Sequence, residues 1–205
     1  MLLAAAGFIP YATAYTATGA QTIAIPAGAS TVTIECIGPG GPGGSDGDNE
    51  WGSGGGGAYS KKTSYSVAGL SGIYLYVAPS TTSLVSGVAT LAKANNSSGA
   101  VICSADYGHG RYANGDAVGG AAANGTGDVK YSGGAGQVGD RNDYAGGGAG
   151  GPTGNGGNGN LASPGSGNGI PAGSGGGGGN PGNIYGGGGG TYSAGAQGWI
   201  RLSWA

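Results

Sequence analysis

The glycine-rich second half of the chain, residues 107–198, most constrains what this sequence can fold into. It contains three long glycine runs, at residues 146–151, 175–179 and 186–190. Glycine loses more backbone entropy on folding than any other residue, offers no side chain to bury, and costs about 1 kcal/mol per residue against alanine in a helix. An α-helix or a conventional side-chain core is therefore excluded in this half.

Two interpretations of this tract remain. Glycine-rich segments of low complexity are commonly disordered. The alternative is a bundle of polyproline-II-like helices with three residues per turn, packed closely because no Cβ atoms intervene and held by main-chain hydrogen bonds. Disordered segments are usually highly charged, whereas only 8% of this chain is charged, so the sequence favours a folded bundle. In that bundle, valine should disrupt folding at interior glycines such as Gly148 and Gly177, and should be tolerated at Gly47.

Composition and charge exclude several classes of function. The chain has 205 residues, of which 55 are glycine, so its side-chain core must be small for its length. Seven Lys and Arg residues and a formal net charge of −2 provide no basic surface for nucleic acid or for an anionic membrane. No apolar run approaches the roughly 18 residues of a membrane span, so we expect no membrane insertion. Residues 1–9 resemble a signal-peptide core without its basic start, and we expect them not to be cleaved.

Short strand patterns flank the glycine tract on both sides. A strand begins at Gln21, and after a turn at residues 26–28 the alternation in residues 31–37 places Val32, Ile34 and Cys36 on one face, which predicts a half-buried hairpin. Further strand-like segments are residues 58–67, 73–77, 84–91, 100–104 and 199–204. Because strands bracket the tract, we expect residues 199–204 to share a sheet with residues 31–37.

The predicted fold is all-β: a small antiparallel sheet or sandwich with an inserted glycine-rich, polyproline-II-like helical bundle. We expect an N-terminal attachment arm at residues 1–20, a strand-rich half at 21–104 with a first glycine-rich excursion at 38–57, and a bundle at 105–205 closed by the C-terminal strand. Residues 21–205 are expected to form one structural unit. Cys36 and Cys103 lie in apolar runs, which favours free buried thiols over a single disulfide.

The matches to catalytic and metal-binding motifs in this sequence are all incomplete. Dinucleotide-type glycine patterns recur, but none lies in a βαβ unit. Residues 55–63 resemble a phosphate loop, but no helix follows them. The acidic loop at residues 46–50 departs from a calcium loop, because Trp51 occupies the sixth position, where such a loop needs glycine. His109 is the single histidine and has no nucleophile motif near it. The sequence predicts no catalytic residue, no metal site and no cofactor, and hence a protein that is not an enzyme.

Aromatic and polar residues gather where the glycine repeat breaks. Tyr, Gly, Ser and Asn with an occasional Arg or Trp is the composition of antibody binding loops, in which tyrosine supplies contact area at low entropic cost. The candidate contact residues are Trp51, Tyr107, His109, Arg111, Tyr112, Arg141, Tyr144 and Tyr185. The other interpretation is that these residues cap the bundle or fill gaps between subunits.

The order of parts resembles a known family across residues 21–205. Residues 25–28 read Ile-Pro-Ala-Gly, residues 32–34 read Val-Thr-Ile before the first glycine run, and residues 54–59 form a Gly-Gly-Gly-Gly-Ala-Tyr return strand. Long glycine runs are then closed by the segment 195–204, which ends in Trp204. This arrangement resembles the glycine-rich domain of bacteriophage tail-fibre and other virion proteins. This sequence differs from the family in one respect, since no fibre shaft or coiled coil precedes the domain.

The resemblance implies a phage structural protein, assembled in the host cytoplasm and located in the virion. Expected partners are other virion proteins, further copies of the chain (a trimer being one option), and a host cell-surface glycan or outer-membrane protein bound by the loops. Leu2, Leu3, Phe8 and Ile9 are expected to be buried against another subunit or virion protein. The alternatives are a purely structural decoration or joining protein and, more remotely, an ice-binding glycine-rich protein.

Overall fold

Alternating apolar residues build two antiparallel sheets that face each other across the core. The computed structural model describes residues 8–45, 51–82, 87–110, 117–139, 144–161 and 163–205. The five-stranded sheet has the order β1 (Tyr11–Tyr15), β12 (Trp199–Trp204), β3 (Thr31–Ile37), β6 (Tyr59–Ser66) and β10 (Val129–Tyr131). The four-stranded sheet has the order β2 (Gly19–Ile23), β7 (Ile73–Val77), β8 (Thr90–Ala94) and β9 (Val101–Ala105).

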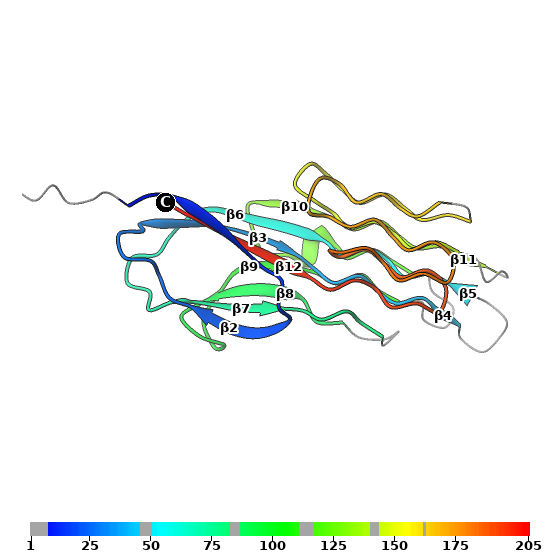
Figure 1. The fold of residues 1–205 in the computed structure, drawn as a ribbon, viewed down its shortest axis with the longest axis horizontal. Coiled ribbons are helices and arrows are strands. Elements are labelled where there is room, and N and C mark those ends of the chain that lie inside the picture. The colour runs from blue at the N-terminus through cyan, green and yellow to red at the C-terminus, as the bar shows by residue number, and fades with distance from the viewer. Residues whose placement is uncertain (1–7, 46–50, 83–86, 111–116, 140–143, 162) are drawn as a thin grey trace, which may run out of the picture.

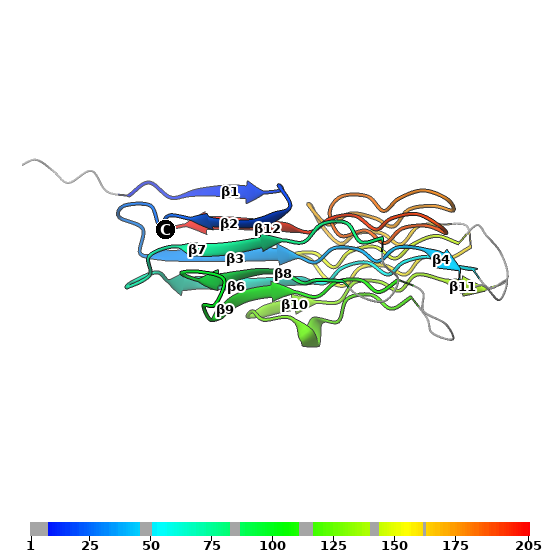
Figure 2. The same ribbon diagram turned by 90° about the horizontal axis from the view of Figure 1, so that it is seen from below.

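Beyond the sandwich, the glycine-rich half extends along the long axis of the molecule to a small third sheet (Figure 1 and Figure 2). This sheet has the order β11 (Val138–Gly139), β5 (Trp51–Gly52) and β4 (Gly44–Ser45). The only helical element in the described part of the chain is a 3₁₀ turn, η1 (Ala122–Asn124). The expectation of an all-β protein with antiparallel sheets is therefore confirmed.

The predicted period-two faces form the sandwich core. Val32, Ile34 and Cys36 of β3 are completely buried and pack with Ile200 and Leu202 of β12. Apolar residues of β7, β8 and β9 complete the same cluster from the facing sheet. Cys36 and Cys103 are both buried in it as free thiols, as expected, and burial raises the pKa of Cys36 well above its usual range.

The expected pairing of the C-terminal strand with residues 31–37 is confirmed. β12 lies antiparallel to β3, in a register that runs from Trp199 opposite Ile37 to Trp204 opposite Val32. Backbone hydrogen bonds continue the ladder between Thr31 and Ala205, at 2.9 and 3.0 Å. The glycine tract therefore leaves the sandwich and returns to it next to the strand from which the first glycine run departs.

The expected hairpin between residues 21–25 and 31–37 is wrong. β2 pairs with β7 and β3 pairs with β12 and β6, so the two strands lie in different sheets. The turn at residues 26–28 is present, with the Ala29 N–H donating to the Pro26 carbonyl over 3.1 Å. This turn carries the chain from the four-stranded sheet to the five-stranded sheet. Each of the two strands can then bury one face against the opposite sheet.

Two further strand boundaries differ from the prediction. No strand is predicted before Gln21, whereas β1 and the start of β2 lie there. Their Ala, Thr and Gly residues lack an apolar alternation, and pairing with β12 and β7 decides their conformation. β8 begins at Thr90 and not at Leu84, and residues 83–86 lie outside the described part.

The glycine-rich half is built of extended segments joined by backbone hydrogen bonds across long sequence separations. The N–H groups of residues 54, 55 and 56 donate to the carbonyls of Gly189, His109 and Gly134, at 2.7, 2.9 and 2.9 Å. These segments carry no helix or long strand, so the expected inserted polyproline-II-like helical bundle is not seen as regular secondary structure. Bonds between segments, rather than within one segment, hold this half together.

Close approach of these backbones requires glycine at most of the crossing points. A Cβ atom on Gly148 would overlap the carbonyl group of Ser166. The prediction that a side chain at Gly177 would disrupt the packing is wrong, because a Cβ atom there would meet nothing nearer than 3.8 Å. Gly47 lies outside the described residues. Interior and peripheral glycines are therefore distinguished by what their missing side chain would meet, which no sequence pattern shows.

Candidate functional site

The three-stranded sheet of β11, β5 and β4 stands at the end of the glycine-rich half and leads into two of the predicted contact loops. Ser45 pairs with Trp51, and Trp51 pairs in turn with Gly139. This end is the far end of the molecule from the C-terminus and from the start of β1 (Figure 1 and Figure 2). The backbones that enter the predicted loops at 46–50 and 140–143 are thus fixed side by side, although those loops lie outside the described residues.

A buried serine fastens the segments behind this end. The Ser53 hydroxyl is fully buried, donates to the Ala145 carbonyl over 2.7 Å, and accepts from the Gln137 N–H at 2.8 Å. The Ser53 N–H donates to the Gln137 carbonyl at 2.9 Å. The strand ends of β5 and β11 and the segment at 144–145 are therefore held together. Sequence reasoning missed Ser53, because a serine among glycines carries no signal of its partners.

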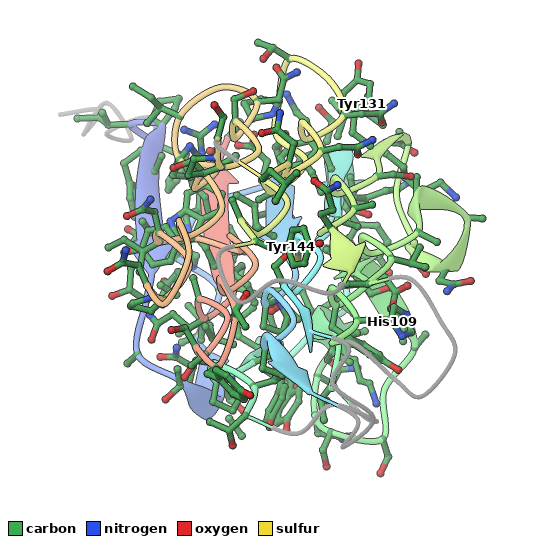
Figure 3. The ribbon with its side chains drawn as sticks, turned by 90° about the vertical axis from the view of Figure 1, so that its right-hand side faces the viewer. His109, Tyr131 and Tyr144 are labelled. Carbon is green, nitrogen blue, oxygen red and sulfur yellow. The ribbon has the colours of Figure 1, made fainter. Side chains whose placement is uncertain are left out.

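Tyr107 and His109, two of the candidate contact residues, have their rings in contact. Their ring centroids are 4.7 Å apart with the planes tilted by 38°, and both side chains are partly exposed. Gly108 between them donates its N–H to the Pro39 carbonyl over 2.8 Å, which fixes the backbone that presents both rings. Viewed from the end of the glycine-rich half, His109 lies to one side of the molecule (Figure 3).

Two of the predicted contact residues are packed inside. Tyr144 is 4% exposed, so its assignment as an exposed anchor is wrong. Figure 3 shows it near the middle of the molecule in the end-on view. Tyr185 is half-buried against a second apolar cluster, formed by Ile37, Tyr59, Ala149 and Trp199, and its ring centroid lies 6.4 Å from that of Trp199. Burial of Tyr144 and packing of Tyr185 agree with the gap-filling role considered for these residues.

The remaining predicted contact residues are only partly described. Trp51 contributes its backbone to β5, between β4 and β11. Arg111, Tyr112 and Arg141 lie outside the described residues, so the structure does not test their place in the surface.

At the predicted attachment arm, Phe8 and Ile9 behave differently. Phe8 packs against the sandwich core of its own chain and lies over Gly28, so it is not free to be buried against another subunit as expected. Ile9 is 81% exposed. Leu2 and Leu3 lie outside the described residues.

A buried acid sits where the five-stranded sheet meets the glycine-rich half. Glu35 is 3% exposed, and its carboxylate accepts from the Tyr59 hydroxyl and from the Arg201 Nε, each at 2.6 Å. The Arg201 guanidinium also makes an ion pair with Glu35 and lies 5.7 Å from the Trp199 ring centroid. Burial, followed by the hydrogen bond to Glu35, raises the pKa of Tyr59 well above its usual range. Every oxygen of this carboxylate has a partner, so the network braces the junction.

Sequence reasoning missed the Glu35 network, although one signal exists. Glu35 is the one charged residue in residues 31–37, between Ile34 and Cys36, and a charged residue that is buried there requires a partner. The β3–β12 register places Arg201 directly opposite Glu35, so the partner follows once strand pairing is known.

Nothing in the described part of the chain suggests a cofactor or metal centre. No group of three or more His, Cys, Asp or Glu side chains lies together there, and the acidic loop at residues 46–50 falls outside it. No helix of that part is long and apolar enough to cross a membrane. Comparison with known proteins gives no matching family model and no matching curated protein.

Proposed function

We propose that this protein is a non-enzymatic structural component of a bacteriophage particle, associated with the tail, whose end loops contact the host surface. The observation that carries the proposal is the convergence of β4, β5 and β11 at the far end from the C-terminus and β1. A protein held in a particle through its sandwich would present these loops outward. The resemblance of residues 21–205 to the glycine-rich domain of tail-fibre and virion proteins supports the same reading.

We propose further that the glycine-rich segments are polyproline-II-like and pack as a bundle. Support comes from a three-residue period in their hydrogen bonds. The N–H groups of Gly54 and Gly57 donate to Gly189 and Gly186 of one neighbouring segment, whereas Gly55 and Gly56 donate to two others. Residues 146–150 behave alike: Gly146 and Ala149 donate to one segment, at Gly176 and Gly173, and Gly147 and Gly150 to another, at Gly54 and Gly57. Three residues per turn is the period of polyproline II.

A bundle of this kind suits a receptor-binding protein because it separates scaffold from contact loops. Main-chain bonds hold the scaffold, so loop side chains are free to vary without loss of packing. The receptor class we propose is a host glycan or an outer-membrane protein, since Tyr, His and Arg offer ring stacking and bidentate hydrogen bonds to such surfaces.

We expect the purified protein to bind host cells and to compete with phage for infection. Tyr107→Ala, Arg111→Ala or Tyr112→Ala should weaken cell binding by about 5- to 30-fold, equivalent to about 1–2 kcal/mol, because anchors of this kind dominate contact energies. The measurement is a cell-binding isotherm for each variant, together with its thermal midpoint.

The matched control is Tyr74→Ala, which removes a half-buried tyrosine from β7 in the sandwich. It should leave cell binding unchanged. Tyr144→Ala should instead lower stability, because Tyr144 is buried. If wild-type protein neither binds cells nor competes with phage, the receptor-binding proposal is wrong.

Deleting residues 1–10 should leave the protein folded but keep it out of particles. The deletion ends before β1, so both sheets keep their strands, whereas it removes the exposed Ile9 together with the contact of Phe8 on the edge of the sandwich core. Phage lacking the gene product would be complemented with each form and the purified particles analysed for the protein. Normal incorporation of the shortened chain would contradict an attachment role for this segment.

The second candidate is a decoration or joining protein without receptor binding. The burial of Tyr144 and the packing of Tyr185 favour it, since both aromatics stabilise the bundle and do not project from it. Particles that lose stability without this protein, while their adsorption rate is unchanged, would select this function.

A further inference from the structure

At β1, the outer edge of the five-stranded sheet carries backbone groups that pair with none of the residues the structure describes. Thr31 and Ala205 donate to each other's carbonyls, and hydrogen-bonded pairs alternate with non-hydrogen-bonded pairs along antiparallel strands. The main-chain groups of residues 199, 201 and 203 of β12 therefore bond to β3, and those of residues 200, 202 and 204 point toward β1. Tyr11, Thr13 and Tyr15 are opposite those three. The N–H and C=O groups of Ala12 and Ala14 therefore point away from the sheet, and both residues are exposed.

This edge lacks the protection that the opposite edge has. Protein edges are commonly guarded by lysine or proline against pairing with another strand. At the other end of the same sheet, β10 carries Lys130 in its middle. β1 has the sequence Tyr-Ala-Thr-Ala-Tyr, without charge or proline, and runs along the margin of the molecule in Figure 2.

The open stretch has defined ends. Pro10 precedes β1 and has no N–H to donate. After β1, the Thr16 carbonyl already accepts from the Gln197 side-chain amide over 2.7 Å. A strand that pairs with β1 therefore finds outward main-chain groups at Ala12 and Ala14, between Pro10 and Thr16.

The sequence of β1 reads the same in both directions, which selects the partner. In an antiparallel pair of two β1 strands centred on Thr13, Tyr11 faces Tyr15 of the second copy, Ala12 faces Ala14 and Thr13 faces itself. Ala12 and Ala14 then form the hydrogen-bonded pairs, and their outward groups satisfy one another. Small alanines bring the backbones together while tyrosines and threonines make the cross-strand contacts that stabilise sheets.

We propose that two copies of the chain associate through β1, in antiparallel register about a two-fold axis at Thr13. The two five-stranded sheets become one continuous sheet. Because the paired strands run in opposite directions, the two glycine-rich halves extend from opposite ends of the dimer. This interface is formed by the sandwich, so it does not depend on the receptor-binding role of the end loops.

Charge-pair variants of the full chain test both the interface and its register. Ala12→Lys combined with Ala14→Lys places like charges opposite each other and should raise the dimer dissociation constant at least about tenfold, measured by sedimentation equilibrium. Ala12→Lys combined with Ala14→Glu places lysine opposite glutamate in both halves of the pair and should restore association. In a parallel pairing, like charges would face each other in the second variant, and no restoration would follow.

Proline and cysteine variants provide independent readouts. Ala12→Pro removes an outward N–H and should abolish the dimer, whereas Lys130→Pro makes the same change at the opposite edge and should leave it intact. Thr13→Cys should form a disulfide-linked dimer under copper-catalysed air oxidation, since the two residues meet at the axis as a close, non-hydrogen-bonded pair. The native cysteines are buried. A wild-type chain that stays monomeric with no cross-link at position 13, or a dimer unaffected by the charge and proline variants, overturns the proposal.

Discussion

Gly148→Ala is expected to destabilise the protein by about 3 kcal/mol, at the upper end of what overpacking costs. The added methyl group would overlap the Ser166 carbonyl and lie 2.7 Å from the Gly165 oxygen. The overlapped carbonyl cannot move aside freely, because it accepts the Gly157 N–H at 2.8 Å. The Gly148 N–H in turn donates to the Gly157 carbonyl at 2.8 Å, so a shift of either segment breaks main-chain bonds.

Gly177→Ala is the matched control in the same tract. Its new methyl group would meet the Asn180 side chain at 3.8 Å and the Pro164 ring at 3.9 Å, both ordinary contacts. Replacing glycine by alanine also lowers the entropy of the unfolded chain, so the change should be neutral or stabilising by about 0.4–1 kcal/mol. Urea unfolding of both variants measures the difference, and equal stabilities would rule out a tightly packed glycine bundle.

Arg201→Met is expected to have the second large effect, a loss of about 2–4 kcal/mol of unfolding free energy. The substitution keeps an apolar stem but leaves the Glu35 carboxylate buried with the Tyr59 hydroxyl as its remaining side-chain partner. Removing one member of a buried pair costs about 3–5 kcal/mol, and the value here is smaller because the Arg201 side chain is 43% exposed. Chemical unfolding near neutral pH measures it.

Two further variants separate the buried network from a surface ion pair. Glu35→Gln combined with Arg201→Met should cost less than Arg201→Met alone, because a neutral amide replaces the unpaired carboxylate. Lys62→Met breaks the exposed pair in which Lys62 Nζ lies 2.7 Å from Asp128 and should change stability far less. A double variant less stable than Arg201→Met would show that the charge of Glu35 is not what Arg201 balances.

Much of the sandwich follows from local pattern. The alternation of Val32, Ile34 and Cys36 predicts a one-sided strand, and all three are buried in the core. The pairing of residues 199–204 with that strand was predictable because apolar strands bracket the glycine tract. β1 was not predictable, since Ala and Thr indicate no buried face and its conformation depends on β12.

The contact surface was only partly predictable, for a related reason. Tyr107 and His109, which loop composition selected, are partly exposed and have their rings in contact, and their role in binding stays a prediction. Loop composition failed for Tyr144, because an aromatic residue flanked by glycine has the same local sequence whether it projects from a loop or fills a gap between segments.

Residue type and spacing were enough to predict that this protein is all-β, that its glycine-rich half has no conventional side-chain core, and that its strands bury alternating residues. These properties depend on residue type and on spacing within one segment. Three features could be read only from the folded chain: β2 and β3 lie in separate sheets, Glu35 meets Tyr59 and Arg201, and Gly148 is crowded while Gly177 is not. Each of these depends on which distant backbones meet, and glycine segments with almost identical sequences carry no information about their partners.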